Sequence, residues 1–131
     1  FRSDMAGVAV VKNAYRLYKE RGYRTKLLVA AFRNQHHWEE FIGGDIVLTI
    51  TSDWQHKYNG SDVVIQNNID TPVAEELLDE LMKLDEFKKA YFEEGLKPEA
   101  FEHYGAFLAT MNQFLGGYDD LVRLIRSYMI K

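Results

Sequence analysis

An arginine between an apolar run and a polar helical segment is the first feature of the sequence that suggests binding. Residues 25–42 read TKLLVAAFRNQHHWEEFI, with Arg33 directly after the apolar run and Asn34 before the helical segment. A guanidinium group presents a planar fork of donors that suits a phosphate. A surface salt bridge with Glu39 or Glu40 is the alternative. Arg33 is therefore a candidate phosphate-binding residue.

Two histidines and a carboxylate follow this arginine and raise the question of a metal site. His36 and Glu40 lie one helical turn apart, with His37 next to His36 in the sequence. Two potential ligands do not complete a site, because protein zinc sites use three or four protein side chains. We therefore expect solvated polar residues here, with no metal and no cofactor.

Composition narrows the class of protein. The chain has 131 residues and a net charge of −4, and it shows no clustered stripe of lysine and arginine, which argues against a nucleic-acid partner. It contains no cysteine, which excludes disulfides and thiolate zinc sites and fits a reducing cytoplasm. No run approaches the roughly 18 apolar residues that a membrane span needs. We expect a cytoplasmic protein with no membrane partner.

The first half of the chain predicts a helix followed by a β-α-β unit. Asp4 to Arg21 carries apolar residues at helical spacing and stops before Gly22. The run 25–31 lacks alternation, which is typical of a strand buried on both faces, and 45–50 (DIVLTI) reads in the same way. Between them, Asn34 is placed to cap a short helix over 35–42, and helix-opening amides there would also suit an anion.

The second half predicts mainly helices. Ser52 is placed to cap a brief helical turn, and 63–65 is strand-like but ambiguous. Thr71 and Pro72 predict the start of a helix. That helix, alone or with a second one, continues to Gly95. Two further helices are expected, one over 99–115 that stops at the glycine pair 116–117 and one from Tyr118 onward.

These elements predict an α/β fold that is mostly helical with about two parallel strands. Two parallel strands do not form a stable sheet alone, because both faces and both edges of such a sheet need cover. A barrel of alternating strands and helices needs about 250 residues. We expect one domain, with 1–51 as late β/α units of such a barrel and 52–131 as its C-terminal helices. The opening FRSDMAGV, without an initiator Met, reads as a cut end.

The same residues resemble the transaldolase family. VKNAYRLYKERGYRTKLLVAAFRN followed by IGGDIVLTIT looks like the late barrel of that family, where a lysine-rich helix leads into a strand ending in a Ser-Phe-Arg-Asn hinge. The tail FEHYGAFLATMNQFLGGYDDLVRLI is similar to the family's closing helices. The resemblance is strongest over 8–50 and 99–125.

The resemblance implies a function and a role for Arg33. It implies an eight-stranded (β/α)8 barrel that transfers a dihydroxyacetone unit between sugar phosphates of the pentose phosphate pathway through a lysine Schiff base. Arg33 would then be the residue that grips the substrate phosphate. Without a lysine in the family's position, the chain alone is expected to be inactive and carries no predicted catalytic residue.

Two departures from the family's pattern accompany this resemblance. Ala31 stands in place of the hinge serine, and Val29 stands in place of a glycine two positions earlier. Lys26 lies in the predicted strand, but not where the family has its Schiff-base lysine.

Two expectations concern partners. A free-standing helical protein-interaction module without catalysis is the alternative to an enzyme. Because the two strands would leave an open edge and apolar faces, we also expect the chain to form a homo-oligomer.

Overall fold

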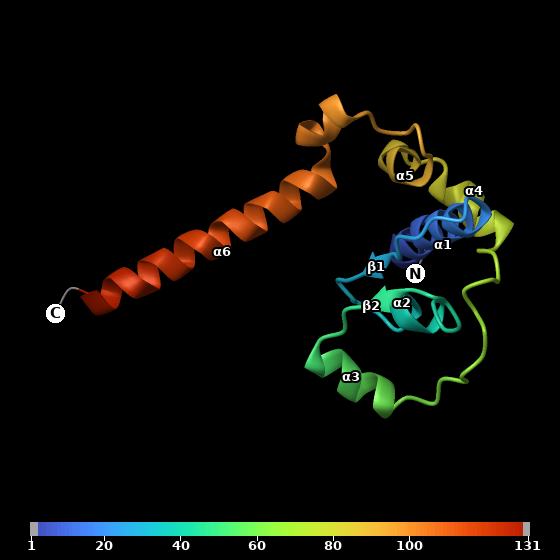
Figure 1. Ribbon diagram of the computed structural model, residues 1–131, viewed down its shortest axis with the longest axis horizontal. Coiled ribbons are helices and arrows are strands. Elements are labelled where there is room, and N and C mark those ends of the chain that lie inside the picture. The colour runs from blue at the N-terminus through green and yellow to red at the C-terminus, as the bar shows by residue number, and fades with distance from the viewer. Residues whose placement is uncertain (1–2, 130–131) are drawn as a thin grey trace. The chain divides into compact units, whose positions relative to one another are not determined.

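The computed structural model describes residues 3–129, which divide into two compact units after Glu93. The first unit holds most of the secondary structure (Figure 1). Its elements are a short 3-10 helix η1 (Ser3–Met5), the helix α1 (Ala6–Glu20), the strand β1 (Leu28–Val29), α2 (His36–Glu39), β2 (Val47–Leu48), α3 (Ser52–Asn59), α4 (Glu75–Leu81) and α5 (Asp85–Tyr91).

Helix α1 confirms the first predicted element. Its apolar residues Val8 and Ala9 are buried. The helix ends at Glu20, two residues before Gly22. Gly22 has a φ of 63°, its amide donates to the Lys19 carbonyl at 3.2 Å, and the Tyr23 amide donates to the Tyr18 carbonyl at 3.1 Å. A residue with a side chain reaches this conformation only at a cost, so the glycine supplies the stop that the sequence predicted.

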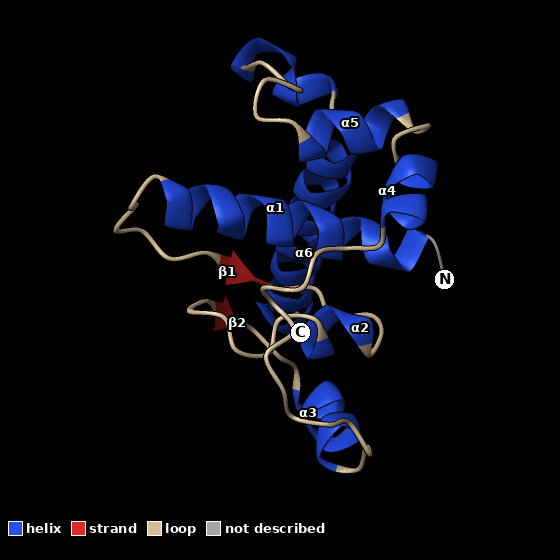
Figure 2. Ribbon diagram, turned by 90° about the vertical axis from the view of Figure 1, so that its right-hand side faces the viewer, coloured by secondary structure: helices blue, strands red, loops and turns tan. Residues whose placement is uncertain are grey.

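The two strands pair in parallel, as predicted, beside α1 (Figure 2). Leu28 lies opposite Val47, and Val29 lies opposite Leu48. The paired segments are two residues long, shorter than the predicted ranges 25–31 and 45–50.

The prediction that both faces of these strands are buried was wrong for this chain. Val29 and Leu48 pack against the core beneath α1, whereas Leu28 is 63% exposed and Val47 is 47% exposed. Exposure alternates because only one face of the two-stranded sheet is covered by the described residues, and successive side chains of a strand point to opposite faces.

The core of this unit consists of two apolar clusters on two sides of α1. Met5 and Val8 join Phe41 and Ile69 on the side of the sheet. The second cluster joins α1 to α4 and α5 through Ala9, Leu81 and Phe87. Helix α1 is therefore the element around which the rest of the unit packs.

A buried lysine adds a polar link between three segments of this unit. Lys12 is 8% exposed, and its Nζ donates to Glu40 Oε2 at 2.5 Å, the Asn68 carbonyl at 2.8 Å and the Thr71 carbonyl at 2.8 Å. Three acceptors satisfy the three donors of an ammonium group, which is the condition under which a buried charge is tolerated. The link fixes the residues after α2, and the chain before α4, to α1.

Several predictions for the middle of the chain need correction. Residues 63–65 form no strand, and Val64 and Ile65 are 71% and 73% exposed in a loop. The helix expected from Pro72 begins at Glu75. It ends before Leu84, whose extended backbone (φ −97°, ψ 117°) separates α4 from α5.

The second unit holds a short 3-10 helix, η2 (Pro98–His103), and the long helix α6 (Gly105–Met129). The predicted break at Gly116–Gly117 was wrong, because α6 runs through both glycines. Glycine costs about 1 kcal/mol relative to alanine inside a helix but does not forbid helical backbone angles, and the flanking residues favour helix. None of the described helices, α6 included, is long and apolar enough to cross a membrane.

Candidate functional site

The carboxyl ends of the two strands define one edge at which the candidate residues gather. Parallel strands end on the same side of a sheet, and the Thr49 amide donates to the Val29 carbonyl at 2.8 Å at this end. The segments that leave this edge lead to α2 and to α3. Ligands of parallel α/β sheets bind outside this edge. Residues 30–37 and 49–55 therefore form the candidate site.

A reversal of the backbone after β1 sets the direction of the arginine. Ala31 has a φ of 63°, the left-handed region that costs a residue with a side chain roughly 1–2 kcal/mol. After it, the Phe32 side chain is buried, with 7% exposed, and Arg33 is exposed. The strained alanine thus separates an anchored aromatic residue from a solvent-facing cation, and strain of this kind is common at binding sites.

The guanidinium of Arg33 forms no hydrogen bond or ion pair with any residue that the structure describes. The predicted alternative, a salt bridge with Glu39 or Glu40, is not formed among these residues. Glu40 is the partner of Lys12, and Glu39 Oε2 lies 4.0 Å from His36 Nδ1. The fork of donors is therefore open to an anion from solution, and its binding of phosphate stays a prediction.

His37 supports the hinge at Arg33 through hydrogen bonds of its ring, a role that the sequence did not reveal. The Arg33 amide donates to His37 Nδ1 at 3.3 Å, and His37 Nε2 lies 2.9 Å from the Asp4 carbonyl oxygen. With Nδ1 as the acceptor, a proton on Nε2 fits donation to the Asp4 carbonyl, and the Asn34 Nδ2 group, 3.0 Å from Nε2, then finds no acceptor there. The imidazole connects the hinge to η1, the turn before α1.

Three amides at the start of α2 are used inside the chain. Asn34 Oδ1 accepts from the His37 amide at 3.2 Å, the bond expected of the predicted cap, although the helix itself begins at His36 with Gln35 before it. Helix α2 is one turn long, and the Trp38 and Glu39 amides donate to the Gln35 carbonyl. These three amides do not point to an anion, and Arg33 remains the candidate anion-binding group of this segment. Within the described residues, no three metal-ligating side chains are close enough to hold a metal ion.

An aromatic cluster around Tyr58, which includes Phe32 of the hinge, was also not predicted. The ring of Tyr58, on α3, lies 6.3 Å from that of Phe32, 4.2 Å from that of Trp38 and 5.5 Å from that of Trp54. Burial raises the pKa of Tyr58 to about 12, and its hydroxyl has no hydrogen-bond partner in the described part of the chain. These contacts attach α2 and α3 to Phe32 and so fix the position of the residue before Arg33.

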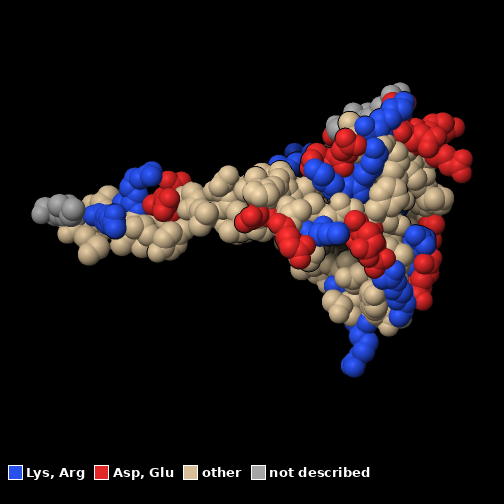
Figure 3. Space-filling view, turned by 90° about the horizontal axis from the view of Figure 1, so that it is seen from above, with Lys and Arg blue, Asp and Glu red and all other residues tan. Residues whose placement is uncertain are grey.

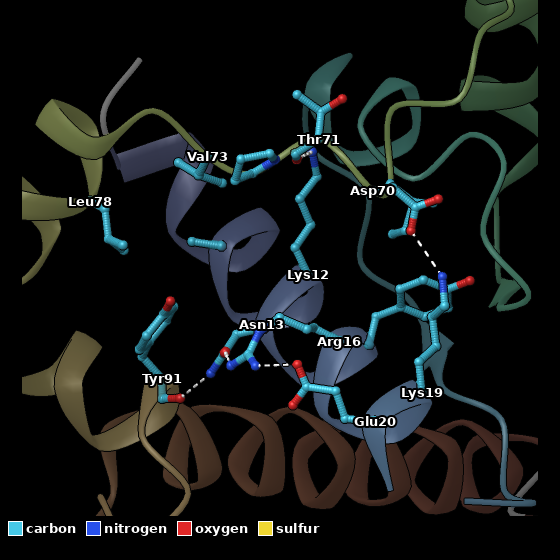
Figure 4. A pocket seen from close by; sticks show the side chains of 14 residues that line it. Lys12, Asn13, Arg16, Lys19, Glu20, Asp70, Thr71, Val73, Leu78 and Tyr91 are labelled. Carbon is cyan, nitrogen blue, oxygen red and sulfur yellow. Dashed lines mark hydrogen bonds and ion pairs between the residues drawn. The ribbon is translucent and has the colours of Figure 1, made fainter. Parts of the chain in front are cut away.

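A pocket of about 330 Å³ lies on another part of this unit, between α1 and the segment 69–73 (Figure 4). Lysine and arginine side chains from α1 line it, but each already has an acidic partner. Arg16 pairs with Glu20 at 2.6 Å, and Lys19 pairs with Asp70 at 3.1 Å. A hydrogen bond from Asn67, together with the bond from the Lys19 ammonium, holds the pKa of the Asp70 carboxyl below its usual range. Arg33 is not among the lining residues, so this pocket is separate from the candidate site.

Two parallel strands that end together, helices that follow them and an arginine at the carboxyl edge are the arrangement of an α/β fold. The sequence model of the family described as Transaldolase/Fructose-6-phosphate aldolase matches residues 1–109. The chain belongs to this family, as the hinge and the flanking segments predicted. The mostly helical fold with two short parallel strands is consistent with part of a barrel of the transaldolase type. No solved structure matches the chain.

Proposed function

We propose that this chain is the C-terminal part of a transaldolase-type enzyme and supplies the group that binds the substrate's phosphate. The enzyme would transfer a dihydroxyacetone unit between sugar phosphates of the pentose phosphate pathway. The single observation that carries the proposal is the Arg33 guanidinium, exposed at the carboxyl edge of a parallel sheet and without a partner among residues 3–129. In a protein of this family, that is the position at which a phosphorylated substrate needs a cation.

The lysine that forms the Schiff base would come from another part of the barrel. A nucleophilic lysine must reach the substrate carbonyl with a free amine, expel water and form an iminium. Lys26 precedes β1 and so lies toward the opposite edge of the sheet from Arg33, and its Nζ pairs with Asp45 Oδ1 at 2.5 Å. Lys12 is enclosed by its three acceptors. Neither is suited to the role. The chain alone is inactive in this proposal, because the family's Schiff-base lysine lies on an earlier strand.

The exchange of the family's hinge serine for Ala31 lowers the number of donors available to the phosphate. A hydroxyl at this position would add one hydrogen bond, worth about 1 kcal/mol, to those of the arginine. The binding energy of the phosphate then depends more strongly on Arg33 than in relatives that have the serine. This makes the arginine the most informative position to change.

The test is kinetic and uses the complete enzyme that contains this chain. Arg33→Ala removes charge-assisted hydrogen bonds worth about 1.5–3 kcal/mol, so KM for a phosphorylated substrate should rise roughly 10- to 100-fold. An unphosphorylated analogue should lose little. Arg33→Lys keeps the charge without the fork and should lie between the two. Equal losses for both substrates would show that Arg33 holds structure, and the proposed role would be wrong.

A further inference from the structure

The long helix α6 carries an apolar stripe that no described residue of its own unit covers. Within residues 94–129, the other element is η2, which ends at His103, before the stripe begins. The surface of α6 is largely free of charged side chains (Figure 3). Its charged residues in the described range are Asp119, Asp120, Arg123 and Arg126, so residues 105–118 carry no charge at all. The stripe lies almost entirely outside the segment matched by the family.

The stripe repeats every seven residues. Alternate steps of three and four residues connect Leu108, Met111, Leu115, Tyr118, Val122, Ile125 and Met129. A second apolar row lies beside the first. Its members directly precede residues 108, 115, 122 and 129 in the sequence, and they are Phe107, Phe114, Leu121 and Tyr128. This spacing of 3.5 residues is the pattern by which one helix packs lengthwise against another.

The exposed area is large enough for a stable interface. Within these two rows Phe114 is 73% exposed, Tyr128 is 74% exposed and Met129 is 77% exposed. With roughly 200 Å² for a fully exposed large side chain, the stripe offers roughly 1,000 Å² of apolar surface, above the largest patch of a typical monomer. A standard protein interface needs about 800 Å² from each partner.

We infer that α6 pairs with α6 of a second copy of this chain, in the antiparallel direction. One register brings residues 107–128 of both stripes together about a two-fold axis near Gly116 and Gly117. It places Leu108 opposite Ile125 of the second copy, Met111 opposite Val122, and Leu115 opposite Tyr118. The second row pairs as Phe107 with Tyr128 and Phe114 with Leu121.

The polar flank of the stripe fits the same register. In an antiparallel pair, equivalent flanking positions of the two helices face each other. The flanking positions are Asn112, Asp119 and Arg126, and this register places Asn112 beside Asp119 of the second copy. No like charges meet, and an amide lies next to each carboxylate. A stripe without charge in its first half, whose flank carries one acidic and one basic residue, is complementary to itself rather than to a partner of one charge.

The first experiment measures self-association of the full 131-residue chain by analytical ultracentrifugation from 0.5 to 50 μM. Ile125→Ser removes a residue from the stripe and should weaken the dimer at least about 100-fold. Leu124→Ser is the matched control, because Leu124 is 55% exposed and Ile125 is 51% exposed, yet Leu124 lies outside both rows. The control should change the dimer constant by less than about threefold. Circular dichroism of both variants verifies that α6 is still helical.

The register is tested by charge at Asn112, which leaves the apolar rows intact. Asn112→Lys would meet Asp119 of the second copy twice and should tighten the dimer roughly three- to tenfold, whereas Asn112→Glu should weaken it by a similar factor. Gln113→Lys and Gln113→Glu, one residue further from the interface, should change it little. A monomer at every concentration, a dimer that tolerates Ile125→Ser, or charges at Asn112 that act in the opposite sense would each overturn the inference.

Discussion

Replacing Lys12 by methionine should destabilise the first unit by about 3 kcal/mol. Methionine keeps most of the volume of the lysine stem, so the loss is polar. The substitution leaves the Glu40 carboxylate, whose side chain is 25% exposed, without its cationic partner. It also leaves the Asn68 and Thr71 carbonyls without the Lys12 donor. Removing one member of a buried ion pair costs about 3–5 kcal/mol, and partial access of water to Glu40 places the effect at the lower end.

The assay is urea unfolding followed by tryptophan fluorescence, because both tryptophans, Trp38 and Trp54, lie in the first unit. Adding Glu40→Gln to Lys12→Met removes the uncompensated charge and should restore about 1–2 kcal/mol. Lys19→Met breaks an exposed pair and should move the midpoint little. The reasoning fails if the Lys12 variant is no less stable than the Lys19 variant, or if the double variant is no more stable than Lys12→Met.

Further predictions concern the hinge, the aromatic residues that support it and the turn at Gly43. Ala31→Gly should stabilise the chain by up to about 1 kcal/mol, since glycine adopts the observed φ without strain, whereas Ala31→Val should destabilise it, both measured as shifts of the urea midpoint. Tyr58→Phe should be neutral or stabilising because the buried hydroxyl has no partner, while Phe32→Ala should cost about 3–5 kcal/mol. Because the folded pKa of Tyr58 is raised to about 12, the protonated phenol favours folding below its ordinary pKa, and this contribution should fall as pH rises from about 10 to 12 in the wild type but not in Tyr58→Phe. Gly43→Ala should be destabilising, because φ is 90° there and a Cβ would lie 2.8 Å from Asn67 Oδ1; a thermal midpoint equal to that of wild type would contradict this.

Local signals in the sequence predicted the elements that local chemistry determines. The helix that ends at Gly22 and the cap at Asn34 depend on residues within a turn of each other, and both are confirmed. The parallel pairing of the strands also followed from their apolar runs. The break predicted at the glycine pair 116–117 was wrong. Glycine ends a helix where its backbone adopts a left-handed conformation, and the sequence does not show the backbone angles.

Contacts between distant segments were beyond this kind of prediction. Lys12 meets carbonyl groups at 68 and 71, and His37 meets the Asp4 carbonyl, so neither role has a sequence pattern. The aromatic cluster around Tyr58 joins α2, α3 and the hinge in the same way. At the site itself, the sequence placed Arg33 after a strand. Only the fold shows that Glu40 pairs with Lys12 and that, within the described part of the chain, the arginine has no partner.

The most direct test of the central claim locates the Schiff base. The complete enzyme, incubated with fructose 6-phosphate and reduced with borohydride, should carry a dihydroxyacetone adduct on a lysine outside the 131 residues of this chain, identified by peptide mass spectrometry. The isolated chain, treated identically, should carry none above the level of free lysine. An adduct on Lys12, Lys26 or another lysine of this chain, formed faster than on free lysine, would contradict the division of labour in which this part of the barrel binds the phosphate and another part performs the covalent chemistry.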